Sequence, residues 1–509
     1  MFTRVNSMGV FGIAAYRVYL EADLSAGFPG FDVVGLPDTA VKESRDRVRA
    51  ALKNSGFSAP HGRITVNLAP ADVKKEGSMY DLPMVIALLC VTGQIKSDLS
   101  QSAFIGEISL DGRVRPVAGV LPMTMEAKKA GLKEFYVPAA NVREASVVKG
   151  IRVYPVESLK ALADHLSGDS LIAAATPPVF SASMTECGGD FAEVKGQIAA
   201  KKALELAAAG GHNVLMIGPP GSGKSMLAKR LPSILPAMSF EEAVETTKIH
   251  SVAGLLNEET ALVTARPFRS PHHTVSAAAL TGGGVVPKPG EISLASGGVL
   301  FLDELPEFPR AVIEALRAPL EDGKVTVSRA AGRATYPCNF TLVAAMNPCP
   351  CGYFGHPHKA CSCSEAAISK YLDKISGPML DRLDIHIEVP PVEFHELTAK
   401  NEEETSAEIR ARVEKARAIQ QKRYAGTGIT CNARLTPAML ERYCVMTEMA
   451  KKTLQTAFER LGLSARGYDR ILKVARTAAD LCDDDIIDVP HIRTAIGMRS
   501  LDRKYWGDR

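Results

Sequence analysis

The stretch from Gly218 to Ser225, GPPGSGKS, brings together residue types that bind phosphate in this 509-residue chain. It fits the spacing G-x-x-x-x-G-K-[ST] of a phosphate-binding loop. An apolar run after Asn213 favours a buried strand before the loop, and the residues from Met226 favour a helix after it. Glycines let the backbone wrap around an anion, and the helix N-terminus adds partial positive charge. The stretch therefore predicts a nucleoside triphosphate site.

Two side chains of this loop can act on the phosphates and on a metal ion. Lys224 would reach the β- and γ-phosphates, and the Ser225 hydroxyl would bind Mg²⁺. ATP and Mg²⁺ are the cofactors that we expect. The full nucleotide-binding set is Gly218, Pro219, Pro220, Gly221, Ser222, Gly223, Lys224, Ser225 and Met226.

Two carboxylates, Asp303 and Glu304, follow the apolar run GVLFL about 80 residues after the loop. A buried strand that ends in acidic residues places them at the carboxyl edge of a sheet, where ligands bind. Asp303 would hold Mg²⁺ through water, and Glu304 would polarise the attacking water. Together with the loop, this pair predicts nucleotide hydrolysis.

Four cysteines form two C-x-C pairs in a loop rich in glycine, proline and histidine. The pairs are Cys349 with Cys351 and Cys361 with Cys363. Four thiolates can surround one Zn²⁺ at about 2.3 Å. Four buried free thiols are the alternative, but the loop has few hydrophobic residues to bury them. We favour a structural zinc site, with His356 and His358 as substitute ligands.

Residues 323–336 alternate as two strands joined by a turn require. Lys324, Arg329 and Arg333 in this hairpin could contact a phosphate backbone, and charges on a solvated hairpin are the alternative. An earlier insertion spans residues 266–294 and contains the pair His272 and His273. We interpret that pair as a turn or a substrate-facing loop rather than a metal site.

The elements that must position these residues belong to a chain too long for one hydrophobic core. The composition is globular, with 46% hydrophobic and 23% charged residues, and the net charge of +3 neither requires nor excludes nucleic acid. No apolar run approaches the ~18 residues of a membrane span. Ten cysteines without a secretion signal indicate reduced thiols or a metal site, so we expect a cytoplasmic protein.

We expect four segments along the chain. Residues 1–167 mix short strands and helices in an α/β domain, and residues 168–189 form a small-residue, proline-bearing linker. Residues 190–390 form the nucleotide-binding core, and residues 391–509 are helical. Within the last segment, Thr405 to Glu408 fits a capping box that opens a helix through Arg423.

The N-terminal segment resembles Lon-type serine–lysine protease domains in two blocks, Phe104 to Gly119 and Ala127 to Asn141. A Lon-type site requires a serine nucleophile activated by a lysine. In our alignment Asp81 falls at the serine position and Leu121 at the lysine position. The resemblance therefore suggests a degenerate domain that serves binding or assembly.

A shifted catalytic pair is the alternative within this domain. Ser78 with Lys74 or Lys75 could form one, although such residues in a glycine-containing turn are more often surface residues.

The whole chain resembles one family, the magnesium-chelatase-like YifB/ComM proteins, through the motifs GPPGSGKS, GVLFLDELPEF and AAMNPCPCG. The resemblance implies an α/β fold with three parts: a degenerate Lon-like N-terminal domain, a P-loop AAA+ core of the helix-2-insert clade, and an all-helical C-terminal lid. Glu193 to Gln197, before the phosphate loop, resembles the segment of AAA+ ATPases that lies on the adenine side of the nucleotide. Asn347, at the end of the apolar run 340–346, would sense the γ-phosphate; a strand-ending turn residue is the alternative.

Two arginines acquire roles only through this resemblance. Arg382, in the segment LDRLD, resembles the finger that reaches the neighbouring subunit's site, where a planar guanidinium suits developing phosphoryl charge. An intrachain pair with Asp381 or Asp384 is the alternative. Arg466 resembles the second sensor of the γ-phosphate, with Arg470 as the second choice.

ComM proteins are known as hexameric, ATP-driven helicases that drive branch migration during natural transformation. The resemblance therefore implies a homo-oligomeric ring, a hexamer, that translocates on single-stranded or branched DNA and works with recombination proteins. Its insertion hairpins would face the central pore. The alternative is a motor that remodels a protein partner, as in magnesium chelatase.

Overall fold

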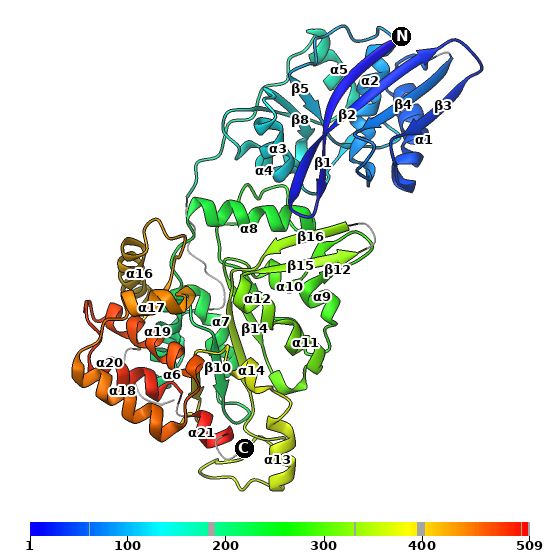
Figure 1. Cartoon of the computed structure of the whole chain (residues 1–509). Helices are drawn as coiled ribbons and strands as arrows, with labels where there is room; N and C mark the ends of the chain where they lie inside the picture. The colour runs from blue at the N-terminus through cyan, green and yellow to red at the C-terminus, as the bar shows by residue number, and fades with distance from the viewer. Residues whose placement is uncertain (61, 182–188, 330–331, 394–402, 500, 507–509) are drawn as a thin grey trace.

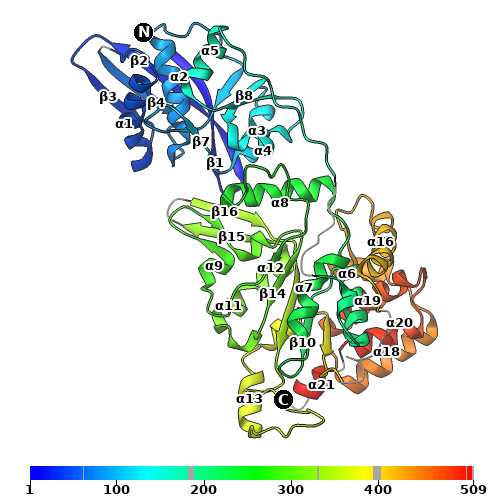
Figure 2. The ribbon, with the colours of Figure 1, turned by 180° about the vertical axis from the view of Figure 1, so that it is seen from behind.

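The computed structural model describes residues 1–60, 62–181, 189–329, 332–393, 403–499 and 501–506. An N-terminal α/β domain stands on a second body, in which a parallel sheet forms the core and the C-terminal helices lie along one side (Figures 1 and 2). Helix α8 (Phe240–Ala253) runs beneath the N-terminal domain. In these ranges, no helix combines the length and the apolar character that crossing a membrane requires.

The N-terminal domain is built on a mixed seven-stranded sheet in the order β3-β4-β2-β1-β5-β8-β9. The apolar sequence of α2, DLPMVIALLCV, buries every residue except Cys90, as a helix inside a core does. The strands are β1 (Phe2–Phe11), β2 (Ala14–Ser25), β3 (Gly30–Val34), β4 (Arg63–Ala69), β5 (Ser102–Phe104), β8 (Glu134–Pro138) and β9 (Arg152–Val156), with the ribbon β6 (Glu107–Ile108) and β7 (Val114–Arg115). The helices are α1 (Thr39–Asn54), α2 (Asp81–Val91), α3 (Val120–Lys129), α4 (Val142–Ser146) and α5 (Leu159–Ser167), with short 3-10 turns at η1 (Ser78–Tyr80) and η2 (Ala139–Asn141).

The core of the second body is a five-stranded parallel sheet in the order β11-β14-β17-β10-β18. Its central strands are buried along their whole length, because helices cover both faces of such a sheet. The strands are β10 (Val214–Ile217), β11 (Phe268–Arg269), β14 (Val299–Leu302), β17 (Thr341–Met346) and β18 (Ile385–Glu388). The helical elements are η3 (Phe191–Glu193), α6 (Ile198–Gly210), α7 (Lys224–Ile234), α8, η4 (Leu305–Glu307), α11 (Arg310–Ala315), α12 (Arg317–Asp322), α13 (Glu365–Leu372) and α14 (Gly377–Leu380).

Two insertions extend this core on the side of the N-terminal domain (Figure 1). The first contains α9 (Ala277–Thr281), the ribbon β12 (Gly282–Gly283) with β13 (Lys288–Pro289), and α10 (Glu291–Leu294). The second is the antiparallel pair of β15 (Lys324–Arg329) and β16 (Gly332–Pro337), which confirms the two predicted strands, while the predicted turn at 330–331 lies outside the described residues.

The C-terminal helical region packs on one face of the sheet through α16 and α19, which both contact α6. Its buried side chains and those of the sheet form one continuous hydrophobic core. Thr405 and Glu408 form the predicted capping box, and the helix ends at Arg423 as expected. The helices are α16 (Ser406–Arg423), α17 (Pro437–Tyr443), α18 (Glu448–Leu461), α19 (Ala465–Leu481), α20 (Val489–Gly497) and α21 (Leu501–Trp506), with the 3-10 turn η5 (Asn432–Arg434). The expected α/β class, with a parallel sheet and a helical C-terminal region, is confirmed.

Candidate nucleotide-binding site

The phosphate loop connects the end of β10 to the start of α7, as its sequence predicts. Gly221 and Gly223 have φ angles of 77° and 90°, which favour glycine. A Cβ at Gly218 would lie 2.2 Å from the carbonyl oxygen of Val389, so the loop passes directly against the chain after β18. Gln197 donates to Pro390 O at 2.6 Å and to Ser222 O at 3.4 Å, which ties the segment before α6 to the loop.

Lys224 and Ser225 begin α7 at the base of this loop. The Lys224 Nζ donates to the carbonyl oxygens of Gly218 and Pro219, both at 2.8 Å. Burial lowers the pKa of Lys224, while Asp303 and Glu304 oppose that shift. The Ser225 hydroxyl donates to Asp303 Oδ2 at 2.6 Å, so the two predicted Mg²⁺ ligands lie next to each other.

Asp303 and Glu304 follow β14 at the carboxyl edge of the sheet, where the sequence places them. The Asp303 carboxylate accepts the backbone N–H of Glu304 at 2.9 Å. Glu304 has a φ of 53°, an unusual backbone for a non-glycine residue, and its side chain is exposed. His273 Nδ1 lies 3.4 Å from Glu304 Oε2, so the first insertion reaches the proposed catalytic carboxylate.

Asn347 directly follows β17, the strand between β14 and β10. Its Oδ1 accepts a hydrogen bond from Lys224 Nζ at 3.3 Å. Lys224, Ser225, Asp303 and Asn347 thus share one edge of the sheet and contact one another in pairs. These four residues can together hold a triphosphate and Mg²⁺, because they offer a cation, a hydroxyl, a carboxylate and an amide.

Arg382 lies at the opposite, amino edge of the sheet. Asn213, just before β10, donates to Arg382 O, whereas the phosphate loop follows the other end of the same strand. The Arg382 side chain is 6% exposed, donates to Pro378 O at 2.5 Å and forms an ion pair with Glu321 of α12. The intrachain partner is therefore Glu321 rather than Asp381 or Asp384. The finger role stays a prediction, and it requires this pair to open.

Arg466 and Arg470 lie in the first turns of α19. Arg466 is exposed, whereas Arg470 Nη1 donates to the buried Asp384 Oδ1 at 2.6 Å. Asp384 also lies at the amino edge, since its N–H donates to Asn213 O. The contact thus holds Arg470 in the junction between sheet and C-terminal helices. The sensor role of Arg466 stays a prediction.

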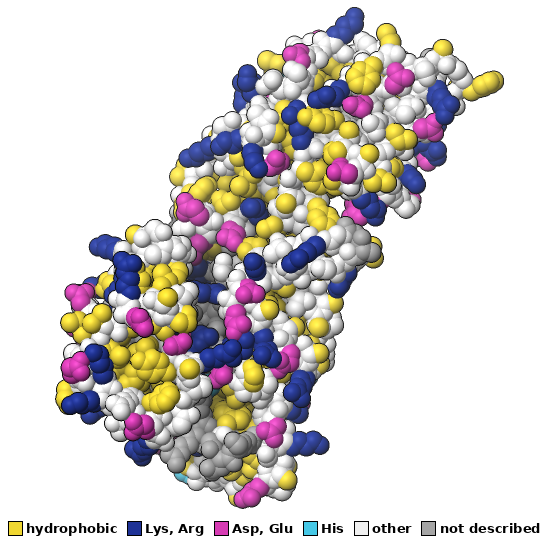
Figure 3. All heavy atoms as spheres, viewed as in Figure 1, with side chains coloured by type: hydrophobic (Ala, Val, Ile, Leu, Met, Phe, Trp, Pro, Cys, Tyr) yellow, Lys and Arg dark blue, Asp and Glu magenta, His cyan; other side chains and the backbone are white. Residues whose placement is uncertain are grey.

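A cavity of about 550 Å³ opens at this edge, between the core and the C-terminal helical region. Arg266, Arg417, Arg434 and Glu321 contribute to its lining. Basic side chains gather on the surface where these two parts meet (Figure 3).

The four cysteines of the two C-x-C pairs converge after β17. Their sulfur atoms all lie within 4.8 Å of one another. Neither His356 nor His358 belongs to this cluster among the described residues, and His356 Nδ1 instead accepts two backbone N–H groups of its own loop.

The predicted DNA-contacting residues divide between the two faces of the β15–β16 hairpin. Ser328 pairs with Arg333 and Lys324 with Pro337, so Lys324 and Arg333 share the exposed face. Arg329 belongs to the other face, and its guanidinium lies beside Gly283 of β12. Their contact with DNA stays a prediction.

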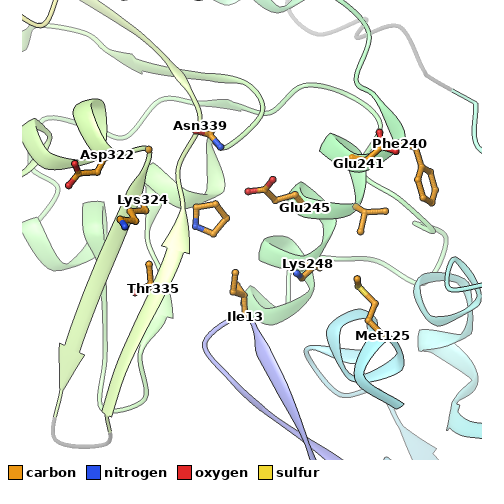
Figure 4. A pocket seen from close by; sticks show the side chains of 13 residues that line it. Ile13, Met125, Phe240, Glu241, Glu245, Lys248, Asp322, Lys324, Thr335 and Asn339 are labelled. Carbon is orange, nitrogen blue, oxygen red and sulfur yellow. The ribbon is translucent and has the colours of Figure 1, made fainter. Parts of the chain in front are cut away.

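The hairpin also contacts the N-terminal domain. A Cβ on Gly332 would lie 2.7 Å from the Phe11 ring, and one on Gly12 would lie 2.9 Å from Ala334 Cβ. Beside this contact, a cavity of about 730 Å³ lies between the β1–β2 turn, α8 and the hairpin, with Ile13, Lys248 and Lys324 pointing into it (Figure 4). The cavity therefore belongs to the domain junction and not to the nucleotide site.

The Lon-like positions have structural partners. Asp81 is buried, and it accepts hydrogen bonds from Ser44 Oγ, from Arg47 Nε at 2.8 Å and from Ile108 N at 3.2 Å. Burial raises the pKa of Asp81, and the Arg47 and Ser44 hydrogen bonds oppose that shift. Leu121 is buried, and its N–H donates to Glu144, which also accepts the hydroxyl of Ser251 on α8. This region therefore docks the domain on the core.

The shifted pair is not assembled either. Lys74 pairs with Glu76 at 2.8 Å, Lys75 donates to Val73 O at 2.7 Å, and Ser78 donates to Glu107. Each of the three residues is thus engaged with another partner.

Sequence reasoning missed several contacts of the site. Glu321 lies 61 residues from Arg382, and the sequence carries no signal that joins them. The sequence predicts His273 only in a turn or substrate-facing loop, yet its ring nitrogen lies next to the Glu304 carboxylate. Asp384, an alternative partner for Arg382, instead pairs with Arg470.

Three regions match magnesium chelatase families. Residues 190–397 match magnesium chelatase, subunit ChlI; residues 20–141 match subunit ChlI of Mg-chelatase; and residues 403–499 match the C-terminal part of subunit ChlI.

Full-length relatives give the same result. The chain is 45% identical over 506 residues to competence protein ComM of Haemophilus influenzae, covering 98% of this chain and 97% of the relative. It is 42% identical over 505 residues to the uncharacterized protein YifB of Escherichia coli, with the same coverage. A Lon protease of Mycolicibacterium smegmatis is 31% identical over 188 residues, which are 35% of this chain and 23% of that protein.

Proposed function

The chain belongs to the YifB/ComM-type, magnesium-chelatase-like AAA+ proteins, and we propose that it is an ATP-hydrolysing ring that translocates on DNA. The observation that carries the proposal is the contact of Lys224 with Asn347 and of Ser225 with Asp303 at one sheet edge. These contacts join three strands of the sheet into a single site.

The residues of this edge fit ATP and Mg²⁺. The loop amides and Lys224 would hold the phosphates, and Ser225 and Asp303 would hold Mg²⁺. Bound Mg²⁺ neutralises phosphate charge and orients the reacting γ-phosphoryl group. Glu304 would accept a proton from the attacking water, and Asn347 would orient that water. His273 of the first insertion, 3.4 Å from Glu304, would sense the change in charge on this carboxylate.

The position of Arg382 supports a ring. It lies at the amino edge, a whole strand away from its own phosphate loop, so as a finger it would act on the phosphate of a neighbouring subunit. The cavity lined by Arg266, Arg417 and Arg434 opens at the same edge and would accommodate the negatively charged phosphates of the neighbour's nucleotide. We therefore propose a homo-oligomer, a hexamer, in which Arg382 leaves Glu321 when the neighbour binds ATP. The C-terminal helical region would act as the lid, and Arg466 would contact the nucleotide from it.

DNA is the proposed substrate because the chain shares 45% identity, over nearly its whole length, with a competence protein. Lys324 and Arg333 on the exposed face of the β15–β16 hairpin would contact the phosphate backbone in the pore. With β12–β13, this hairpin would form the moving elements of a helix-2-insert core. We propose branch migration in recombination or transformation as the outcome, together with recombination proteins.

The cytoplasm is the compartment that we propose. None of the nine cysteines that the structure describes is in a disulfide, as reducing conditions favour.

The test is the rate of ATP hydrolysis with no DNA and with single-stranded, duplex and four-way-junction DNA, at several salt concentrations. A DNA motor should be stimulated, and stimulation should fall as salt rises. Glu304→Gln should retain ATP binding and lose about 100-fold or more in turnover, since general base catalysis contributes that much. Glu307→Gln is the matched control, because Glu307 lies one turn further on and pairs with the exposed Lys374. An ATP hydrolysis rate that none of these DNAs changes would refute the proposal of a DNA motor.

A further inference from the structure

The sulfur atoms of the cysteine cluster lie close enough together to share one metal ion. Cys349 Sγ lies 3.4 Å from Cys351 Sγ and 3.7 Å from Cys361 Sγ, and the last two sulfurs lie 3.5 Å apart. Four sulfurs at about 2.3 Å from one Zn²⁺ are separated by about 3.8 Å in an ideal tetrahedron. A disulfide, by contrast, requires about 2.05 Å. The observed separations therefore fit a shared metal better than a covalent pair.

The surroundings of Cys351, Cys361 and Cys363 argue against ordinary core packing. Cys351, Cys361 and Cys363 are only partly buried, and they come from two separate ends of an irregular loop. The N–H of Phe354 donates to Cys349 Sγ at 3.3 Å, a contact that stabilises a thiolate. Cys349 is buried in the core, whereas the three partly exposed thiols beside it gain less from hydrophobic burial than fully buried thiols would.

We propose that Cys349, Cys351, Cys361 and Cys363 bind one structural Zn²⁺, and that this metal knuckle positions the nucleotide site. The second half of the proposal rests on the proposed ATPase function, whereas metal binding does not.

The positioning role follows from two direct connections. Cys349 lies two residues after Asn347, so a metal bond at Cys349 limits movement at the end of β17. Gly352, with a φ of 84°, lies against the phosphate loop: a Cβ there would approach Pro220 Cδ to 2.5 Å. The knuckle thus contacts the loop that would hold phosphate and adjoins the side chain that would orient water. Cys349 is also part of the core beneath the sheet, which anchors the knuckle.

Metal content is the first measurement, made on the purified full-length chain. We expect about one zinc per chain, released when a mercurial reagent titrates the thiols. Cobalt(II) in place of zinc should give the visible absorption bands of a tetrahedral thiolate site. Less than about 0.1 zinc in the folded protein, with cobalt giving no such bands, would overturn the proposal, as would a disulfide between any of these cysteines.

Matched variants locate the metal. Cys361→Ser with Cys363→Ser should lose the zinc. Cys482→Ser is the informative control, because Cys482, Asp484 and His491 form the other group of metal-ligand side chains in the described residues. This control should keep its zinc; loss of zinc in Cys482→Ser and its retention in the double serine variant would place the metal elsewhere and overturn the assignment.

The only tryptophan of the chain, Trp506, reports on the knuckle without any enzyme assay. Its ring lies 5.9 Å from Tyr505, whose ring lies 6.3 Å from Phe354 in the cysteine loop. Zinc release should change Trp506 emission, and re-addition of zinc should restore it. No change in emission on release would refute a metal that orders this loop.

The positioning role has its own readout. Metal-free protein should hydrolyse ATP at least 10-fold more slowly, and zinc should restore the rate. It should also bind a fluorescent ATP analogue more weakly, by about 3-fold to 10-fold, because the loop contacts Pro220 as well as adjoining Asn347. Unchanged binding and turnover in metal-free protein would refute the positioning role but not the zinc site itself. Both measurements are independent of any effect of DNA.

Discussion

Replacing Asp384 with asparagine removes one charge from the buried junction between the sheet and the C-terminal helices. The carboxylate accepts Arg470 Nη1 at 2.6 Å and the Asn213 N–H at 3.2 Å, and it lies 3.3 Å from His212 Nδ1. On the far side of the ring, His212 Nε2 lies 2.7 Å from the Thr477 hydroxyl of α19. The charge thus holds α19 against the start of β10.

The expected cost follows from burial. The Asp384 side chain is fully buried, while that of Arg470 is 21% exposed. Breaking a buried ion pair by removing one partner costs about 3–5 kcal/mol. The amide keeps an acceptor for Asn213 and Arg470 can partly reach water, so we expect about 2–3 kcal/mol for Asp384→Asn.

The pH dependence gives a second signature. Burial favours the neutral acid, but Arg470 and His212 outweigh it and hold the pKa of Asp384 well below its usual range. The folded pKa is thus lower than that of the unfolded chain, about 3.9, so the stabilisation is complete above that pH and is lost as pH falls below it. The difference between wild type and variant should therefore be constant near neutral pH.

The assay is native-state hydrogen exchange at the amides of α19 and β18, because one melting temperature is poorly defined for a chain of several parts. Asp483→Asn is the control: its pair with Lys415 is exposed, at 58% and 65%, and should change stability by less than about 0.5 kcal/mol. Adding Arg470→Met to Asp384→Asn should recover part of the loss by removing the unpaired cation. An effect of Asp384→Asn no larger than that of Asp483→Asn would refute the reasoning.

Three further predictions test the site itself. Gly352→Ala should weaken ATP binding about 5-fold to 30-fold, measured with a fluorescent analogue, because backbone strain and the contact with Pro220 together cost about 1–2 kcal/mol; Gly355→Ala, at a φ of 74° with open space around it, should not. Arg382→Ala should lower ATP turnover about 1,000-fold or more if it serves as a finger, and mixing it with Lys224→Ala subunits should restore turnover, since each supplies what the other lacks; no restoration would place Arg382 outside the neighbour's site. Lys324→Ala should reduce the salt dependence of DNA binding by about one phosphate contact, whereas Arg329→Ala, on the other hairpin face, should change it less; equal effects would contradict the assignment of faces.

Local sequence patterns are enough to predict the motifs that lie within one short segment of the chain. The order of apolar strand, glycine loop and helix start places Lys224 and Ser225 without any long-range information, because the loop geometry depends on the residues of the loop. The capping box of Thr405 and Glu408 is equally local. The convergence of the four cysteines was predictable because two short pairs in one loop have few ways to meet.

Sequence patterns alone thus predict the phosphate loop, the acidic strand end, the paired strands of residues 324–337 and the cysteine loop. The pairs of Arg382 with Glu321, His273 with Glu304 and Arg470 with Asp384 are visible only in the folded chain. These partners are separated by 61, 31 and 86 residues, counted along the chain from their numbers. A charged side chain has no preferred partner at such separations until strand order and helix packing bring one within reach, and strand order is a property of the whole sheet.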